Sequence, residues 1–175
     1  GSLAGTQTSG VWAFTPTTNA FHMWLSFGTN YMDWRIDEVH LYNRVLSSTE
    51  VNTLQTSTID DGLLLHYDFD SWIVGDNAVW GNSNSVTNYW TTSVSSEKWW
   101  NAAYFDGTAS IRTLDATHNN IWTVRSVSAW VNLESYPSAW TRTVLYKHQE
   151  FLIRIHSDGR VHGFVWNGIN WEPHV

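Results

Sequence analysis

Carboxylates are the first side chains in this sequence that could do chemistry, but their spacing is not that of a catalytic pair. Glycoside hydrolysis needs two carboxyl groups across one bond, about 5 to 9.5 Å apart. Asp37 and Glu38 are adjacent, so on a strand they are predicted to point to opposite faces, and no third acid follows within 37–41. Asp68 and Asp70 alternate, but two aspartates at a strand end are typical of turns or calcium sites. We therefore expect no catalytic residues and no enzyme.

The histidines form no recognisable metal or catalytic motif in the sequence. There is no glycine-rich phosphate loop, no zinc-type histidine spacing and no Ser-His-Asp order. The 8 histidines are scattered, and a single histidine on a strand is usually solvated or hydrogen-bonded.

Aromatic rings are the second group of side chains that could bind a ligand, since the chain has 13 Trp, 7 Tyr and 7 Phe. If 151, 153 and 155 face the core, and 161 and 165 do so across a hairpin, the residues between them face outward together. Rings that stack on the apolar face of a sugar, beside donors for its hydroxyls, are typical of glycan binding. The alternative is a ring cluster packed against a loop or a neighbouring repeat. The predicted ligand-binding residues are Arg154, His156, His162, Phe164, Trp166, His22 and Trp24.

Short strands separated by Gly, Asn, Ser and Asp turns must position these residues, which predicts an antiparallel β protein. The run His156-Ser-Asp-Gly159 predicts a tight hairpin turn, because Asp-Gly tolerates positive φ angles. Trp130 is predicted to lie in the core, between small and β-branched neighbours. The polar stretch 75–94 is expected to be a long exposed loop. The predicted strands are 21–27, 63–69, 102–105, 127–131, 143–147, 151–155 and 161–166.

One short helix is predicted after residue 47. Ser47 and Glu50 fit a capping box, in which each side chain bonds the backbone amide of the other residue. Val51 and Leu54 then share a face of a helix about two turns long.

Length and charge limit the classes of partner. A chain of 175 residues has room for one domain, and without cysteine it has no disulfide framework. The net charge of -7 disfavours phosphate backbones and anionic membranes, so we expect neither nucleic acid nor membrane as a partner. No apolar run approaches the roughly 20 residues of a membrane span.

Five motifs stand out in the sequence. They are Leu64-Leu-His-Tyr-Asp-Phe-Asp70, Ala102-Ala-Tyr-Phe-Asp-Gly107, Ser128-Ala-Trp-Val131, Trp171-Glu-Pro-His-Val175 and Ile36 to Ser47. Together they resemble motifs of the laminin G-like or concanavalin A-like jelly-roll family, in which the last of them is the ending motif. The resemblance implies an all-β, two-sheet antiparallel jelly-roll β-sandwich with one short helix.

The order of these motifs is rotated relative to the family. Residues 1–58 resemble the last part of such a module and 59–175 its first two-thirds, so we expect 1–175 to form a single jelly-roll domain. A piece cut from tandem repeats, or a circularly permuted module, would have this order. About one hairpin of the family pattern is then missing between Val175 and Gly1. The resulting unpaired strand edge would invite self-association or a neighbouring repeat.

The resemblance also implies a structural Ca²⁺, held by oxygen ligands near the motif ends. The candidate acids are Asp70, Asp76, Asp106 and Asp37. The sequence departs from the family at Val79-Trp-Gly-Asn-Ser, where an aspartate is usual, and Asp106 could instead cap a turn while Asp37 bonds a neighbouring loop.

The expected function is a non-catalytic carbohydrate-binding or adhesion module, with a glycan or polysaccharide as partner. Its expected place is extracellular, on a cell surface or on a virion. The main alternative is a structural tandem repeat of a large surface or tail-fibre protein that makes protein contacts only. A weaker alternative is a glycosidase whose acids lie in the missing segment.

Overall fold

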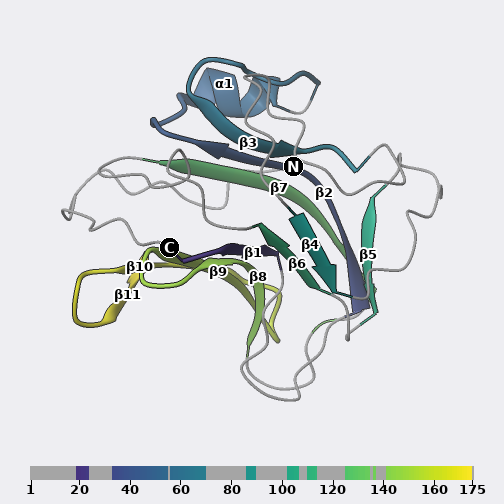
Figure 1. Cartoon of the computed structure of the whole chain (residues 1–175), viewed down its shortest axis with the longest axis vertical. Helices are drawn as coiled ribbons and strands as arrows, with labels where there is room; N and C mark the ends of the chain where they lie inside the picture. The colour runs from purple at the N-terminus through teal and green to yellow at the C-terminus, as the bar shows by residue number, and fades with distance from the viewer. Residues whose placement is uncertain are drawn as a thin grey trace.

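The structure is a β-sandwich of two antiparallel sheets packed face to face (Figure 1). It is a computed structural model of the chain. The described residues are 19–23, 33–54, 56–69, 86–89, 102–106, 110–113, 125–134, 136 and 141–174, with backbone only at 33, 86–89, 106 and 174. Among them, no helix has the length and apolar character that crossing a membrane requires.

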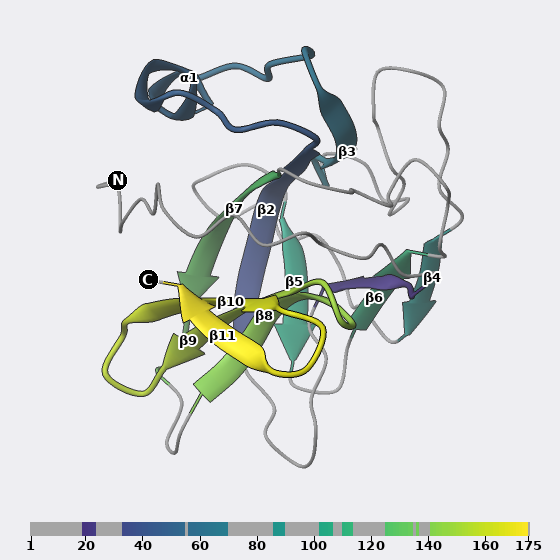
Figure 2. The same cartoon turned by 90° about the vertical axis from the view of Figure 1, so that its left-hand side faces the viewer.

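The larger sheet has seven strands in the order β11-β10-β9-β8-β1-β6-β4. Consecutive strands β8 to β11 are joined as hairpins, whereas β1 inserts between β8 and β6 from far away in the chain. Figure 2 shows β9, β10 and β11, which lie side by side at one end of this sheet. The strands are β1 (Phe21–Met23), β4 (Val86–Tyr89), β6 (Ser110–Thr113), β8 (Thr141–Lys147), β9 (Phe151–His156), β10 (Val161–Trp166) and β11 (Trp171–His174).

The smaller sheet is arranged around β2 (Asp33–Tyr42), which pairs with β3 (Leu63–Tyr67), β5 (Ala103–Asp106) and β7 (Ser126–Leu133). Along one edge, β2 pairs with β5 over 33–36 and with β3 over 39–42. Its other edge pairs with β7. Strands before residue 58 therefore hydrogen-bond to strands after it in both sheets.

The core lies between the two sheets because each sheet turns one apolar face inward. Trp34 and Phe105, from adjacent strands of the smaller sheet, are fully buried with ring centroids 5.9 Å apart. The hydroxyls of Tyr67 and Thr113 hydrogen-bond across the core and join the sheets. The larger sheet contributes Phe21, Met23, Ile111, Val144, Leu145, Phe151 and Ile155.

A second, smaller apolar cluster lies beneath the helix α1 (Ser48–Thr53), on the outer side of the smaller sheet (Figure 1). Tyr42 and Leu54 are buried there, and Val51 packs against them, as the shared helix face predicted. The predicted capping box is confirmed: the Ser47 hydroxyl accepts from the Glu50 amide, and Glu50 accepts from the Ser47 amide.

The structure corrects two expectations of the sequence. Trp130 is 47% exposed, because 127, 129, 131 and 133 are the residues of β7 that pack on the core and Trp130 alternates with them. The stretch 75–94 contains a strand, β4, because Val86–Tyr89 pairs with β6. Val161 is the Cα partner of the core residue Ile155 and so faces the predicted side, but it is exposed because it begins β10 at the end of the sheet.

Candidate functional site

The outer face of the larger sheet carries a row of side chains that crosses four neighbouring strands. His22 is the Cα partner of Tyr146, Tyr146 of Leu152, and Leu152 of Phe164. Directly opposed residues of antiparallel strands share a face of the sheet. The residues on either side of His22 belong to the core, so this row points away from it.

Ring contacts extend this row into a continuous aromatic strip. The ring of His22 lies 6.1 Å from that of Tyr146, and Tyr146 lies 6.1 Å from Trp171, measured between centroids. Trp171 meets Trp166 edge to face at 5.4 Å. Edge-to-face contacts at this distance are favourable for aromatic pairs, so the strip is held in place by its own members.

The polar groups of this face lie near the turn of the β9–β10 hairpin, at the other end of β10 from Trp166. Arg154 pairs with His162 across the hairpin, and its guanidinium carbon lies 5.7 Å from the Phe164 ring centroid. His156 stacks on His162 at 5.6 Å, and His162 lies 6.3 Å from Phe164. The turn that follows His156 is the predicted one, with Gly159 at φ 85°. We call this set the aromatic face: His22, Tyr146, Arg154, His156, His162, Phe164, Trp166 and Trp171. Tyr146 is buried, and the other members are half-buried.

Strand alternation places six of the seven predicted ligand-binding residues on the aromatic face. They are Arg154, His156, His162, Phe164, Trp166 and His22. Trp24 lies outside the described residues. The prediction missed Tyr146 and Trp171. Alternation along β8 was a signal for Tyr146, because Leu145 faces inward, and pairing with Trp166 in the last hairpin was a signal for Trp171.

The aromatic face combines a neutral imidazole with a cation at neutral pH. Burial, together with the nearby Arg112 guanidinium, lowers the pKa of His22 to about 4. Burial also lowers the pKa of Arg154, although Tyr146 opposes this shift. Since an arginine side chain stays protonated in proteins, Arg154 supplies fixed donors beside the Phe164 ring.

The acids predicted to bind Ca²⁺ are only partly within the described residues. Asp70 and Asp76 lie outside them, and Asp106 is described by its backbone, which pairs with Asp33 at the end of β5. The Asp37 carboxylate accepts a hydrogen bond of 2.9 Å from the Glu38 amide. The calcium site therefore stays a prediction.

A different set of metal-ligating side chains meets on the smaller sheet, next to a β-bulge in β2. Asp37 pairs with Trp130 and His40 with Ser128, so two residues of β2 lie opposite one residue of β7. Before the bulge the even-numbered Trp34 and Ile36 enter the core, and after it the odd-numbered residues 39 and 41 do. An extra residue in one strand shifts the alternation in this way and re-aims the side chains beyond it. His40 therefore points away from the core.

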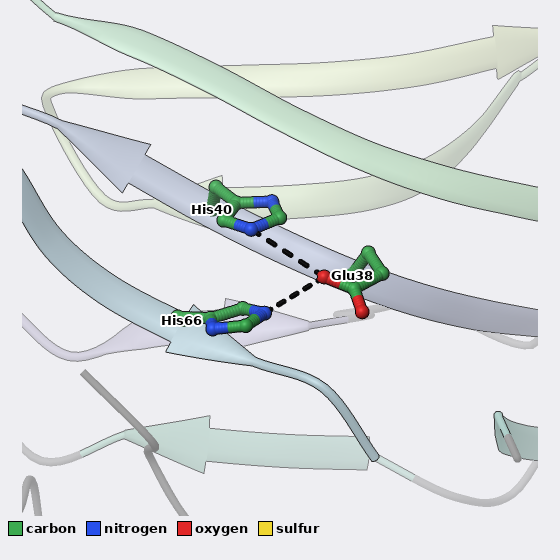
Figure 3. Close-up of side chains that lie close together, drawn as sticks. All are labelled: Glu38, His40 and His66. Carbon is green, nitrogen blue, oxygen red and sulfur yellow. Dashed lines mark hydrogen bonds and ion pairs between the residues drawn. The ribbon is translucent and has the colours of Figure 1, made fainter. Parts of the chain in front are cut away.

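His40 and His66 lie directly opposite each other on β2 and β3, and Glu38 lies against both (Figure 3). Glu38 Oε2 is 2.8 Å from His66 Nε2 and 3.4 Å from His40 Nε2. The two imidazoles stack with centroids 4.2 Å apart. One carboxylate oxygen thus faces a nitrogen of each ring.

His40 has an unusual environment for a histidine. It is 1% exposed, and neither of its ring nitrogens makes a hydrogen bond within the described residues. Burial and, to a smaller extent, His66 lower its pKa to about 4 against the opposing effect of Glu38. The hydrogen bond with His66 keeps the pKa of Glu38 below its usual value. A buried polar group left without a partner costs about 1 to 3 kcal/mol.

Sequence reasoning missed this cluster and treated the histidines as scattered. Glu38 and His40 are two residues apart on one strand, which was a usable signal for a shared face. His66 comes from a different strand, and only the register of β2 with β3 places it opposite His40.

Comparisons with protein-family models, with curated proteins and with solved structures found no match.

Proposed function

We propose that this chain is a non-catalytic carbohydrate-binding or adhesion module of the concanavalin A-like jelly-roll type, whose binding surface is the aromatic face. The main observation in support is the aromatic strip. In it, His22, Tyr146, Trp171 and Trp166 make consecutive ring contacts across the outer face of one sheet. We place the module outside the cell, on a cell or virion surface.

The chemistry of the aromatic face suits sugars. Flat rings contact the apolar C–H face of a pyranose, while donors at the edge bond its hydroxyls. Trp166, Trp171 and Phe164 are half-buried, so parts of their rings reach the surface. Arg154 and His162, opposite each other at one end, supply the donors.

The test is a tryptophan-fluorescence titration of the full chain against a panel of soluble polysaccharides and glycans. We expect a saturable, sugar-specific change, and Trp166→Ala to lower the affinity at least about 30-fold, the loss typical of an aromatic hot spot. The matched control is Trp130→Ala, which removes an exposed tryptophan from the other sheet and should leave affinity unchanged. Running the panel with calcium and with a chelator tests whether Ca²⁺ organises the site.

Unchanged affinity in Trp166→Ala, with circular dichroism like that of the parent, would place the binding site elsewhere. If no glycan of the panel changed the fluorescence, this would favour the structural repeat, in which the aromatic face contacts another protein module. The position of β11 at the edge of its sheet, with Ile169 78% exposed in the preceding turn, supports that second candidate. Edge strands and exposed apolar side chains are typical of such contacts.

A further inference from the structure

The cluster of Glu38, His40 and His66 has the ligand set of a transition-metal site. One donor atom from each residue lies within 4.8 Å of the other two. Imidazole nitrogen and carboxylate oxygen together suit Zn²⁺ and related ions, whereas Ca²⁺ prefers oxygen ligands throughout. Two histidines and one glutamate form a known ligand set for zinc with one coordination position open.

One of the distances between donor atoms matches the spacing that zinc requires, and another is shorter. Metal–ligand bonds of about 2.0 to 2.2 Å place tetrahedral ligands roughly 3.3 to 3.5 Å from one another. Glu38 Oε2 lies 3.4 Å from His40 Nε2 and 2.8 Å from His66 Nε2. The two rings stack 13° from parallel, and imidazole binds a metal in the plane of its ring, so one ring must tilt out of the stack for both nitrogens to meet one ion. Metal binding would replace the hydrogen bond between Glu38 and His66.

The burial of His40 is the second observation that indicates a ligand. Its side chain is 2% exposed, and neither ring nitrogen has a hydrogen-bond partner among the described residues. Its Nε2 faces the Glu38 carboxylate (Figure 3). This contact is 3.4 Å long and is not a hydrogen bond, and buried polar atoms without hydrogen bonds are uncommon in folded proteins. A metal ion would give this nitrogen a bond.

The backbone holds the ligands in place without the ion. His40 and His66 are paired residues of adjacent strands, so their spacing follows from the sheet. Glu38 is the bulge residue at which β2 changes its neighbour from β5 to β3, and its φ of 48° is in the left-handed region. Such a conformation persists where the surrounding structure imposes it, and bulges of this kind aim side chains at functional sites.

We propose that Glu38, His40 and His66 form a binding site for one divalent transition-metal ion, Zn²⁺ by ligand chemistry, on the outer side of the smaller sheet. His40 and His66 bind through Nε2 and Glu38 through Oε2, and water takes the open position. The Glu38 side chain is 26% exposed, so the ion enters from its side. This site is on the other sheet from the aromatic face, so metal binding and glycan binding can be tested independently.

The experiment titrates Zn²⁺ into the full chain by calorimetry, after chelator treatment and dialysis, and repeats the titration with Co²⁺ under visible absorption. We expect one equivalent to bind, with the intense Co²⁺ bands of a tetrahedral site. Loss of one of three ligands should weaken affinity at least about 100-fold, the upper end for losing an indirect partner of a ligand. The variants are Glu38→Gln and His66→Gln, and the control is His162→Gln on the other sheet.

Absence of Zn²⁺ binding would overturn the proposal, as would Zn²⁺ binding that Glu38→Gln leaves unchanged. If His66→Gln alters the circular dichroism, Glu38→Gln decides, because it keeps the size of a partly exposed side chain. Displacement of Co²⁺ by an equal concentration of Ca²⁺ would contradict the assigned ligand set. Equal loss in His162→Gln would place the ion among the histidines of the aromatic face instead.

Discussion

Single residues in this protein occupy environments that differ sharply from the usual ones for their type. Glu38 holds a left-handed φ of 48°, which costs a non-glycine residue of order 1 to 3 kcal/mol. The Asp37 carboxylate accepts a hydrogen bond from the Glu38 amide, and the Glu38 carboxylate hydrogen-bonds the His66 ring. These two hydrogen bonds offset part of that cost. The strained residue is the one that faces both buried histidines.

His22 provides a prediction about pH. Its pKa falls to about 4 in the fold, chiefly through burial and also through Arg112, whereas an unfolded histidine titrates near 6.5. As the pH falls from 6.5 towards 4, the unfolded chain takes up a proton that His22 in the folded chain does not, so the fold loses stability. Tyr146 is the other titratable side chain in ring contact with it.

We therefore expect His22→Gln to reduce the loss of stability on acidification. The measurement is urea unfolding of the parent and variant at pH 7 and pH 5, compared as the change in free energy of unfolding for each protein. The comparison of changes cancels the ring contact with Tyr146 that the variant loses at both pH values. An equal change in both proteins would mean that another group carries the acid sensitivity.

At the scale of elements, β2 links the three other strands of its sheet, and α1 covers one end of that sheet. The helix has only six residues, too few to be stable by itself. It depends on Leu54 packing against Tyr42 and on its N-cap. Glu50, besides its part in the capping box, bonds the Arg44 guanidinium at 2.7 Å, which ties the helix to the end of β2.

Ser47→Ala should lower the free energy of unfolding by about 1 kcal/mol, the usual cost of losing an N-cap side chain. The reason is that the Glu50 amide loses its acceptor and Glu50 loses its bond from the Ser47 hydroxyl. Urea midpoints measure the effect. Ser48→Ala, the same change at the next, exposed position, is the control and should cost less. Equal midpoints for the two variants would show that the cap contributes nothing measurable.

At the scale of the whole molecule, strands from before and after residue 58 are interleaved in both sheets. β1 lies between β8 and β6, and β2 lies beside β3, β5 and β7. Among the described strands, β3, β5 and β7 have β2 as their paired neighbour and no other. Neither sheet is therefore formed by one half of the chain.

We expect residues 59–175 alone not to fold, since they lack β2, the strand that β3, β5 and β7 share. Far-UV circular dichroism and the dispersion of amide NMR signals would report this. Adding the separate fragment 1–58 should restore both signals. Cooperative unfolding of 59–175 by itself would contradict the expectation and divide the chain into independent units.

The sequence by itself determined the local features. Alternation along 151–155 and 161–166 is a property of extended backbone, so it was enough to predict most of the aromatic face. The capping box and the Asp-Gly turn involve residues within four positions of each other, and both were predictable for that reason.

Only the tertiary structure decided which distant segments meet. The pairing of β2 with β3 places His66 opposite His40, and a one-residue bulge turns His40 away from the core. The face of β7 that packs inward was likewise unreadable from composition, which is why Trp130 was placed in the core. Register and bulges are set by the fit of whole sheets, and a shift of one residue reverses every side chain beyond it.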